Sequence, residues 1–380
     1  MAPARRWTTE EIITACRFCW MCRHVCTVGN VTCKESHTPR GKTLLLYSML
    51  AEMNIPEQEI ADCVYKCALC YRCMENCVSA IDVPQVMLNT RAEMVREGSP
   101  PSEIQNAYDS LMKERGSALS LPYKTREHGL DRVGELPDKA PIILFGGRAT
   151  YTYTPGALSG ASEILKAARI DHTILGQQGW SGYEFYEIGY LDDAIHTAKE
   201  TLELLENVID DSSGPAYVIT LDPSDNWALG ELYRQWGLDV PFNVIDFSSY
   251  VKQLVDSGEV SFRDADIEVC YHDPCHLGRL QRVFTQPREL LSSISGLVIK
   301  EMHWNREQAY CCGGHIRASD KSIATGAVLD LVKEIKATQA PVVVTACPTC
   351  CDSLKQADNV FDVYHIAEFL AQYLRSNSTG

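Results

Sequence analysis

The sequence lacks the features of several large protein classes. Its longest apolar stretches, such as TLLLYSML and VVVTAC, are far shorter than the roughly 20 residues of a transmembrane helix, so no membrane span is expected. Residues 1–30 contain no apolar segment typical of a secretory signal, which favours a cytoplasmic protein. The chain has 35 Lys and Arg against 50 Asp and Glu, and this acidic balance argues against nucleic acid as a partner.

Familiar cofactor and nucleophile motifs are also missing. The chain contains no G-x-G-x-x-G, no P-loop and no nucleophile elbow. No flavin or nicotinamide site can therefore be recognised. Any hydride transfer linked to this chain is expected on another protein.

Cysteine, by contrast, is abundant, with 17 residues in the chain of 380. Two runs repeat the spacing C-x2-C-x2-C-x3-C, and they comprise Cys16, Cys19, Cys22 and Cys26, then Cys67, Cys70, Cys73 and Cys77. A structural zinc site uses four ligands in total, and a disulfide framework needs an oxidising compartment. The two runs therefore favour two [4Fe–4S] cubane clusters over zinc or disulfides.

The spacing also indicates how the thiols are shared. Three ligands of a cubane come from one tight loop, while the fourth cysteine of each bacterial ferredoxin run binds the other cluster. The expected ligand sets are Cys16, Cys19, Cys22 and Cys77 for the first cluster, and Cys67, Cys70, Cys73 and Cys26 for the second. The usual proline after the fourth cysteine is replaced by Thr27 and Val78, which are not ligand positions.

A second group of cysteines has the spacing C-x35-CC-x34-C-x2-C and comprises Cys275, Cys311, Cys312, Cys347 and Cys350. The segments 267–273 and 342–347 read as buried strands, and Gly313 with Gly314 permits a tight turn after the double cysteine. Loops at the ends of parallel strands converge on one crevice, so these thiols are expected to meet. The alternative is that they are buried packing residues.

This pattern resembles the cysteine-rich "CCG" domain of heterodisulfide reductase-type proteins. The same domain occurs in the iron–sulfur subunits of glycolate oxidase and anaerobic glycerol-3-phosphate dehydrogenase. The segment Pro39-Arg40-Gly41-Lys42 resembles a further motif of these subunits. The resemblance implies that the five cysteines hold a third [4Fe–4S] cluster, which has noncubane geometry in the heterodisulfide reductase branch.

The resemblance implies a fold of class α + α/β with three parts. A helical, two-cluster ferredoxin-like domain is expected at 1–125, and two α/β CCG domains are expected at 141–258 and 267–375. The first copy has Trp180 and Ser181 in place of the double cysteine, and Asp222 and Asp225 in place of C-x2-C. Because aspartate and indole are poor substitutes for thiolates, this degenerate copy is expected to bind no cluster. A pocket lined by Trp180, Tyr183, Asp222 and Asp225 is the alternative.

Several other residues have open interpretations. His276 and His315 flank proposed ligands and either donate toward cluster sulfur or make ordinary hydrogen bonds. Arg40 and Lys42 either lie near the cubanes or begin a solvated helix. The cysteines outside the patterns are expected to be structural, and they are Cys33, Cys63, Cys270 and Cys351.

The expected function is that of an iron–sulfur electron-transfer subunit in a flavin-dependent dehydrogenase complex. A partner flavoprotein would oxidise the substrate, and electrons would leave to a quinone-linked acceptor or an electron-transfer flavoprotein. One alternative is the catalytic subunit of a heterodisulfide (thiol/disulfide) reductase. A cluster-bearing redox sensor is a third, although no DNA-binding element supports it.

Overall fold

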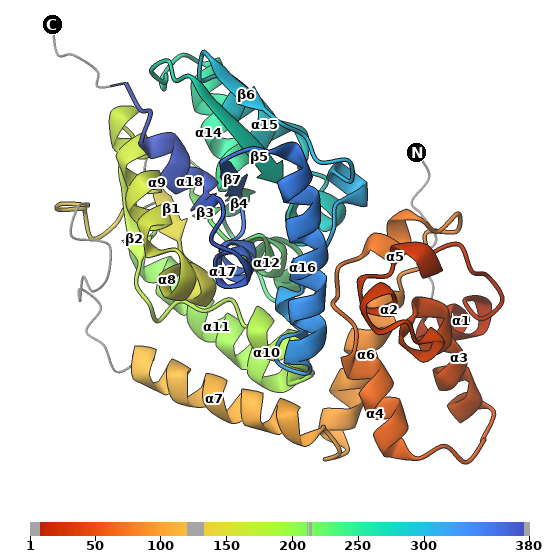
Figure 1. Cartoon of the computed structure of the whole chain (residues 1–380). Coiled ribbons are helices and arrows are strands. Elements are labelled where there is room, and N and C mark those ends of the chain that lie inside the picture. The colour runs from red at the N-terminus through yellow and green to blue at the C-terminus, as the bar shows by residue number, and fades with distance from the viewer. Residues whose placement is uncertain (1–7, 120–132, 211, 213–214, 376–380) are drawn as a thin grey trace, which may run out of the picture.

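The computed structural model describes residues 8–119, 133–210, 212 and 215–375 (Figure 1). A helical N-terminal part is followed by two α/β lobes, each built on a four-stranded parallel sheet. The mixed helical and α/β class is therefore confirmed. The domain boundary expected at residue 125 falls outside the described residues.

Local sequence signals set the helix starts of the N-terminal part. Thr8 forms a capping box with Glu11, and Thr38 caps a helix whose first residue is Pro39. Asp82 caps a third helix in the same way. The α-helices of this part are α1 (Thr9–Ala15), α2 (Thr27–Thr32), α3 (Pro39–Leu50), α4 (Glu57–Tyr65), α5 (Arg72–Glu75), α6 (Val83–Arg96) and α7 (Ser102–Leu119).

The first lobe contains a sheet with strand order β2-β1-β3-β4. Its strands are β1 (Ile142–Phe145), β2 (His172–Leu175), β3 (Tyr217–Thr220) and β4 (Asn243–Asp246). Its helices are α8 (Gly147–Tyr153), α9 (Pro155–Ala167), α10 (Tyr183–Ile188), α11 (Leu191–Val208), α12 (Pro223–Trp227), α13 (Tyr233–Gln235) and α14 (Phe247–Asp256). A π-helical turn at Ala228–Leu232 joins α12 to α13.

The second lobe has the same arrangement, with strand order β6-β5-β7-β8. Its strands are β5 (Ile267–His272), β6 (Leu297–Ile299), β7 (Val342–Thr345) and β8 (Asp362–His365). Its helices are α15 (Thr285–Ser292), α16 (Lys321–Thr338), α17 (Pro348–Ala357) and α18 (Ile366–Ala371), and a π-helical turn at His276–Leu280 follows β5. The strands expected at 267–273 and 342–347 are confirmed as β5 and β7.

The two lobes share one hydrophobic core. Leu158 and Ile219 of the first lobe belong to the same buried cluster as Val344 and Phe369 of the second. Helix α9 packs on α18 so closely that a Cβ atom at Gly160 would lie 2.6 Å from the carbonyl oxygen of Ala367. The lobes are therefore held in a fixed relation, which matters for any site between them.

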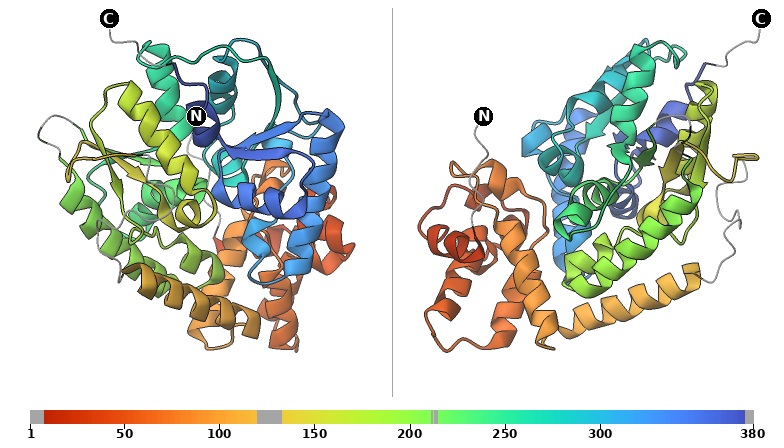
Figure 2. Two further views of the ribbon diagram at one scale, coloured as in Figure 1. Left: turned by 60° about the vertical axis from the view of Figure 1, so that its left-hand side comes forward. Right: turned by 180° about the vertical axis from the view of Figure 1, so that it is seen from behind.

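The helical N-terminal part is attached to both lobes. Helix α7 runs beneath the first lobe, along the bottom of Figure 1, and Figure 2 shows the same course from behind. On the second lobe, α2 packs on α16, where Val31 lies against Gly326. The hydroxyl of Tyr65 donates to the Ile188 carbonyl of α10 at 3.1 Å. Among the described helices, none has the length and apolarity needed to cross a bilayer.

Candidate iron–sulfur sites and the adjoining cavity

The first set of thiols lies at the outer end of the helical part. Cys16, Cys22 and Cys77 are mutual neighbours. Burial is the main cause that raises the pKa of Cys22 to about 12, and the nearby sulfurs of Cys16, Cys26 and Cys77 add to this shift. The Thr43 hydroxyl donates to the Cys16 carbonyl at 2.9 Å and holds this loop on α3. Cys19, on the same loop, is exposed. The fourth cysteine of the second run thus lies with the first loop, as the ferredoxin pattern predicts.

The second set lines a single small cavity. Cys26, Cys67, Cys70 and Cys73 all face it. Leu69 and Tyr71 on either side of Cys70 have positive φ angles of 47° and 59°, which curl the loop tightly. The Gly29 amide donates to the Cys26 sulfur at 3.3 Å.

Lys42 is the charged residue of the same cavity. Its side chain is 2% exposed and its ammonium donates to the His37 carbonyl at 2.5 Å. Its positive charge opposes the effect of burial on the pKa of Cys26. Lys42 therefore lies near the second set rather than at a solvated helix start. Arg40 instead lies over the Trp20 ring and pairs with Glu35.

All five cysteines of the third set are buried and come together. Cys275 follows β5, and Cys347 follows β7 as the N-cap of α17. The Cys350 and Cys312 sulfurs are 3.3 Å apart, and Cys275 and Cys311 belong to one buried cluster. A hydrogen bond from Cys311 and the adjacent His315 lower the pKa of Cys275 to about 6, although burial opposes this shift. The carboxyl ends of the parallel strands thus converge as expected.

The donor chemistry of all three sets suits iron–sulfur clusters. All thirteen sulfurs are free thiols, and they gather in groups of four, four and five from separate segments. Soft thiolates that converge in this way are the ligands these clusters require. Burial, and then negative charge on neighbouring thiolates, raises the pKa of several of these cysteines. A cationic metal core would offset that negative charge.

The second and third sets touch each other. The Cys70 side chain packs against the buried cluster that contains Cys311, although the two residues lie 241 positions apart. Arg279, which is 1% exposed, donates to the Cys70 carbonyl at 2.5 Å and to the Ala309 carbonyl at 2.9 Å. The His276 ring nitrogen Nε2 lies 3.1 Å from the Leu69 carbonyl. The N-terminal loop and the C-terminal site are therefore joined by direct contacts.

The first lobe places different chemistry at the equivalent position. Ser181 donates to Asp225 at 2.5 Å, whereas the corresponding contact in the second lobe joins Cys312 and Cys350. Asp225 fills the space above Gly147, where a Cβ atom would lie 1.9 Å from its carboxylate. Asp222 caps α12, as its Asp-Pro sequence predicts.

The glycines of the two lobes also correspond. Gly182 and Gly313 have φ angles of 81° and 77°, and each lies against a carbonyl, that of Ala194 in α11 and that of Ala324 in α16. In both places a side chain would collide with the helix. The two turns thus follow the same path, but only the second carries thiols.

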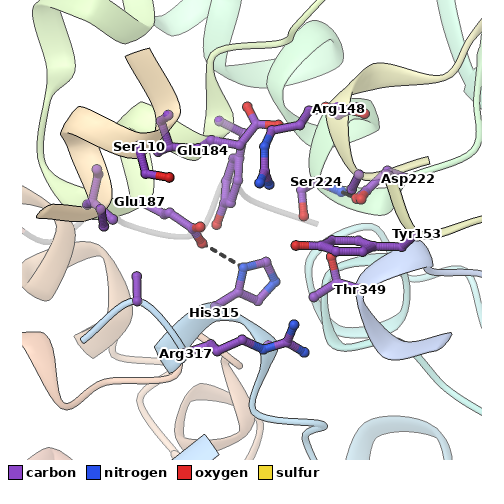
Figure 3. Close-up of a pocket in the computed structure, with 18 of the residues that line it drawn as sticks. Ser110, Arg148, Tyr153, Glu184, Glu187, Asp222, Ser224, His315, Arg317 and Thr349 are labelled. Carbon is purple, nitrogen blue, oxygen red and sulfur yellow. Dashed lines mark hydrogen bonds and ion pairs between the residues drawn. The ribbon is translucent and has the colours of Figure 1, made fainter. Parts of the chain in front are cut away.

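A polar cavity of about 280 Å³ lies between the lobes (Figure 3). Its lining includes Arg148, Tyr153, Glu184, Glu187, Asp222 and Ser224 of the first lobe, His315, Arg317 and Thr349 of the second, and Ser110 of α7. Burial, opposed by Arg148, raises the pKa of Glu184 to about 7. A neighbouring cavity of about 570 Å³ includes Cys312 in its lining and shares Tyr153 and Arg317 with the first.

The two histidines have different surroundings. His276 uses both ring nitrogens, since Nδ1 lies 3.1 Å from the Ser224 hydroxyl, so the ordinary hydrogen-bonding interpretation applies. His315 lies 2.7 Å from Glu187 and contacts Cys275. Burial disfavours its charge, but these two partners hold the pKa of His315 well above its usual range. Cys275, His276 and His315 are also close enough to hold a single metal ion, which keeps zinc as an alternative to test.

The pocket expected around Trp180 is partly different in the structure. Tyr183, Asp222 and Asp225 line the cavity, but Trp180 is 2% exposed in the core and its indole donates to the Gln177 carbonyl. Arg148 and Arg317 were not foreseen as lining residues, because they come from separate lobes and belong to no motif. The cysteines expected to be structural are buried at positions 63, 270 and 351, whereas Cys33 is exposed.

Comparison with known proteins agrees with this arrangement. Residues 269–355 match the cysteine-rich domain family CCG. The chain is 28% identical to one component of the dihydromethanophenazine:CoB–CoM heterodisulfide reductase of Methanosarcina acetivorans, over 92% of each chain. It is 26% identical to one component of the fumarate reductase (CoM/CoB) of Methanothermobacter marburgensis, over 89% of this chain and 66% of the relative.

More distant similarities extend the picture. The probable iron–sulfur-binding oxidoreductase FadF of Bacillus subtilis is 25% identical over 84% of this chain and 47% of its own length. A crystal structure of a hypothetical protein from Helicobacter pylori has the same fold over 88% of this chain and 68% of its own, with a TM-score of 0.58 and 8% identity. The chain is thus related to CCG-domain iron–sulfur subunits of oxidoreductases, which confirms the resemblance inferred from its cysteine motifs.

Proposed function

We propose that this chain is the iron–sulfur electron-transfer subunit of a flavin-dependent dehydrogenase complex in the cytoplasm. A partner flavoprotein oxidises a small substrate and passes electrons singly to this chain. They leave to a quinone-linked acceptor or an electron-transfer flavoprotein. The observation that carries the proposal is the packing of Cys70 against the buried cluster that contains Cys275 and Cys311, together with the bond from Arg279 to the Cys70 carbonyl, because these contacts bring the second and third thiol sets together.

The proposal assigns three [4Fe–4S] clusters, which supply one-electron exchange when bound. The first is held by Cys16, Cys19, Cys22 and Cys77, the second by Cys67, Cys70, Cys73 and Cys26, and the third by Cys275, Cys311, Cys312, Cys347 and Cys350. The third need not be cubane, since five thiols from three segments converge there. The corresponding domains are a ferredoxin-like part at 1–125, a degenerate CCG domain at 141–258 and an intact one at 267–375.

In this proposal the first lobe binds no cluster. The hydrogen bond between Ser181 and Asp225 takes the place of the Cys312–Cys350 contact. Hard oxygen donors do not suit an iron–sulfur core, and Asp225 occupies the space against Gly147. The lobe instead completes the walls of the cavity between the lobes.

A second candidate function is disulfide reduction. The cavity of about 570 Å³ supports it, because Cys312 of the third thiol set is among the residues that line it. The Methanosarcina relatives are named as components of a heterodisulfide reductase. Against it, two thiolates are released only when two electrons reach one place, and this chain has one complete set of five cysteines.

The two functions are separated by assays with and without a partner. The isolated, cluster-loaded chain is expected to show no dehydrogenase activity, whereas a co-purified flavoprotein should reduce its clusters in the presence of substrate. Cys70→Ala should block electron exit while the partner's flavin still becomes reduced. Cys33→Ala, at an exposed thiol outside the three sets, is the matched control. Catalytic reduction of a disulfide by the isolated chain with a reduced low-potential dye, abolished by Cys312→Ser, would overturn the relay in favour of the reductase.

A further inference from the structure

Large apolar side chains are exposed around the first thiol set. Phe18, Trp20 and Met21 are 75%, 56% and 56% exposed, and they lie on the loop between Cys16 and Cys22. Val78 directly follows Cys77 and is 94% exposed. Because Cys77 lies beside that loop, these four side chains surround one group of sulfurs. We refer to Phe18, Trp20, Met21 and Val78 as the apolar patch.

The exposure is concentrated in one part of the molecule. Of the thirteen large apolar side chains exposed in the described residues, eight lie between Phe18 and Val78. Single exposed apolar residues are ordinary, but a group of them marks an interaction surface. Aromatic residues and Met are also the types enriched in protein interfaces.

The apolar patch has a positively charged border. Arg40 lies over Trp20 at 4.4 Å, measured from the guanidinium carbon to the ring centre, and Arg17 lies partly buried between Phe18 at 4.7 Å and Tyr47 at 3.6 Å. Arg23 and Arg40 share a single carboxylate, Glu35. Residues 16–26 and 77–81 contain no Asp or Glu, in a chain with a net charge of −15.

The apolar patch lies beside a solvent-exposed cysteine of the first thiol set. Cys19 is exposed beside it, whereas all five cysteines of the third set are buried. Cys73 and Cys77 pack against the buried cluster that contains Cys16, so the first set adjoins the second, and Cys70 packs against the cluster that contains Cys311. A partner that binds at the apolar patch would therefore lie next to the first of the three adjoining thiol sets.

We propose that the apolar patch is the docking site of the flavoprotein partner, whose matching face is apolar with a rim of carboxylates. This inference rests on the proposed electron-transfer function and adds where and with what chemistry the partner binds. A second copy of this chain fits less well, since two such faces would bring Arg17, Arg23 and Arg40 against their equivalents. Complementary charge steers redox partners to one another and speeds their association.

The test uses flavodoxin, a small acidic flavoprotein, as the probe. Affinity for oxidised flavodoxin is measured first, followed by the second-order rate at which flavodoxin hydroquinone reduces the anaerobically purified chain. Trp20→Glu and Val78→Glu introduce charge into the apolar patch without touching a proposed ligand. Val360→Glu, at a 69% exposed valine next to β8 on the second lobe, is the matched control. The rate at which free reduced FMN reduces each variant is measured as a second control, because free FMN reports on the clusters without depending on a docked protein.

The expected result is at least a tenfold loss of flavodoxin affinity and rate in both apolar-patch variants, since hot-spot residues of an interface carry losses of this size. The control variant and the reactions with free FMN should be unchanged, and higher salt should slow the flavodoxin reaction. Equal behaviour of the apolar-patch and control variants, or no binding of flavodoxin to the unaltered chain, would overturn the docking proposal. A different outcome would show that the apolar patch binds a membrane surface and not a flavoprotein. In that case the unaltered chain binds anionic phosphatidylglycerol vesicles, and the two apolar-patch variants lose this binding but still bind flavodoxin. If the anaerobically purified, unaltered chain contained no iron, that result would count against the electron-transfer function. The measured affinity for flavodoxin would still decide whether the apolar patch is the docking site.

Discussion

Arg279 provides a quantitative test of how the second and third thiol sets are held together. Its guanidinium is buried and donates to the carbonyls of Cys70, Ala309 and Glu307 at 2.5, 2.9 and 3.2 Å. Arg279→Gln removes these charge-assisted bonds and leaves carbonyl groups without donors in an apolar environment. Each orphaned buried polar group costs about 1–3 kcal/mol, so three orphaned carbonyls would cost about 3–9 kcal/mol.

Because the glutamine amide can still donate to one of the three carbonyls, we take about 4 kcal/mol, for two orphaned groups, as the loss of unfolding free energy. At 2–4 °C per kcal/mol for a unit of about 150–250 residues, the unfolding midpoint should fall by roughly 8–16 °C. The assay is differential scanning calorimetry of anaerobically purified protein. Arg96→Gln is the matched control, because Arg96 is 75% exposed and pairs with Glu93, which is 64% exposed. An exposed pair contributes about 0–1 kcal/mol, so equal midpoints for the two variants would refute the bridging role of Arg279.

Two further predictions concern the lobes and the buried histidines. Cys312→Ser should remove one paramagnetic species from the electron paramagnetic resonance spectrum, whereas Ser181→Ala should leave the spectrum intact, and equal effects would contradict a cluster-free first lobe. Burial lowers the pKa of His365 to about 4, so the unfolded chain takes up a proton below about pH 6.5 that the folded chain refuses. Stability should therefore fall by about 3 kcal/mol between pH 6.5 and 4, at 1.36 kcal/mol per pKa unit. Chemical denaturation of His365→Gln should lack this step, while His196→Gln, at a 66% exposed side chain, should retain it.

Patterns that are local in sequence predicted local structure well. The buried strands expected at 267–273 and 342–347 are β5 and β7 in the structure. Cysteine spacing likewise predicted that Cys77 would lie with the first loop. Each of these features depends on backbone geometry over a few residues.

Features that depend on tertiary packing could not be predicted in this way. Cys70 and Cys311 come together from segments 241 positions apart, and no motif marks Arg279 as the residue that joins these segments. The cavity between the lobes combines Arg148 and Arg317, which the chain separates by 169 positions.

The most direct test of the electron-transfer account is iron and acid-labile sulfide analysis of the chain purified without oxygen. Three four-iron clusters predict about twelve irons and about twelve sulfides per chain. About eight of each would mean that the third thiol set holds no cluster. Stoichiometric zinc with only eight irons would place a metal ion at Cys275, His276 and His315 instead and contradict the continuous relay.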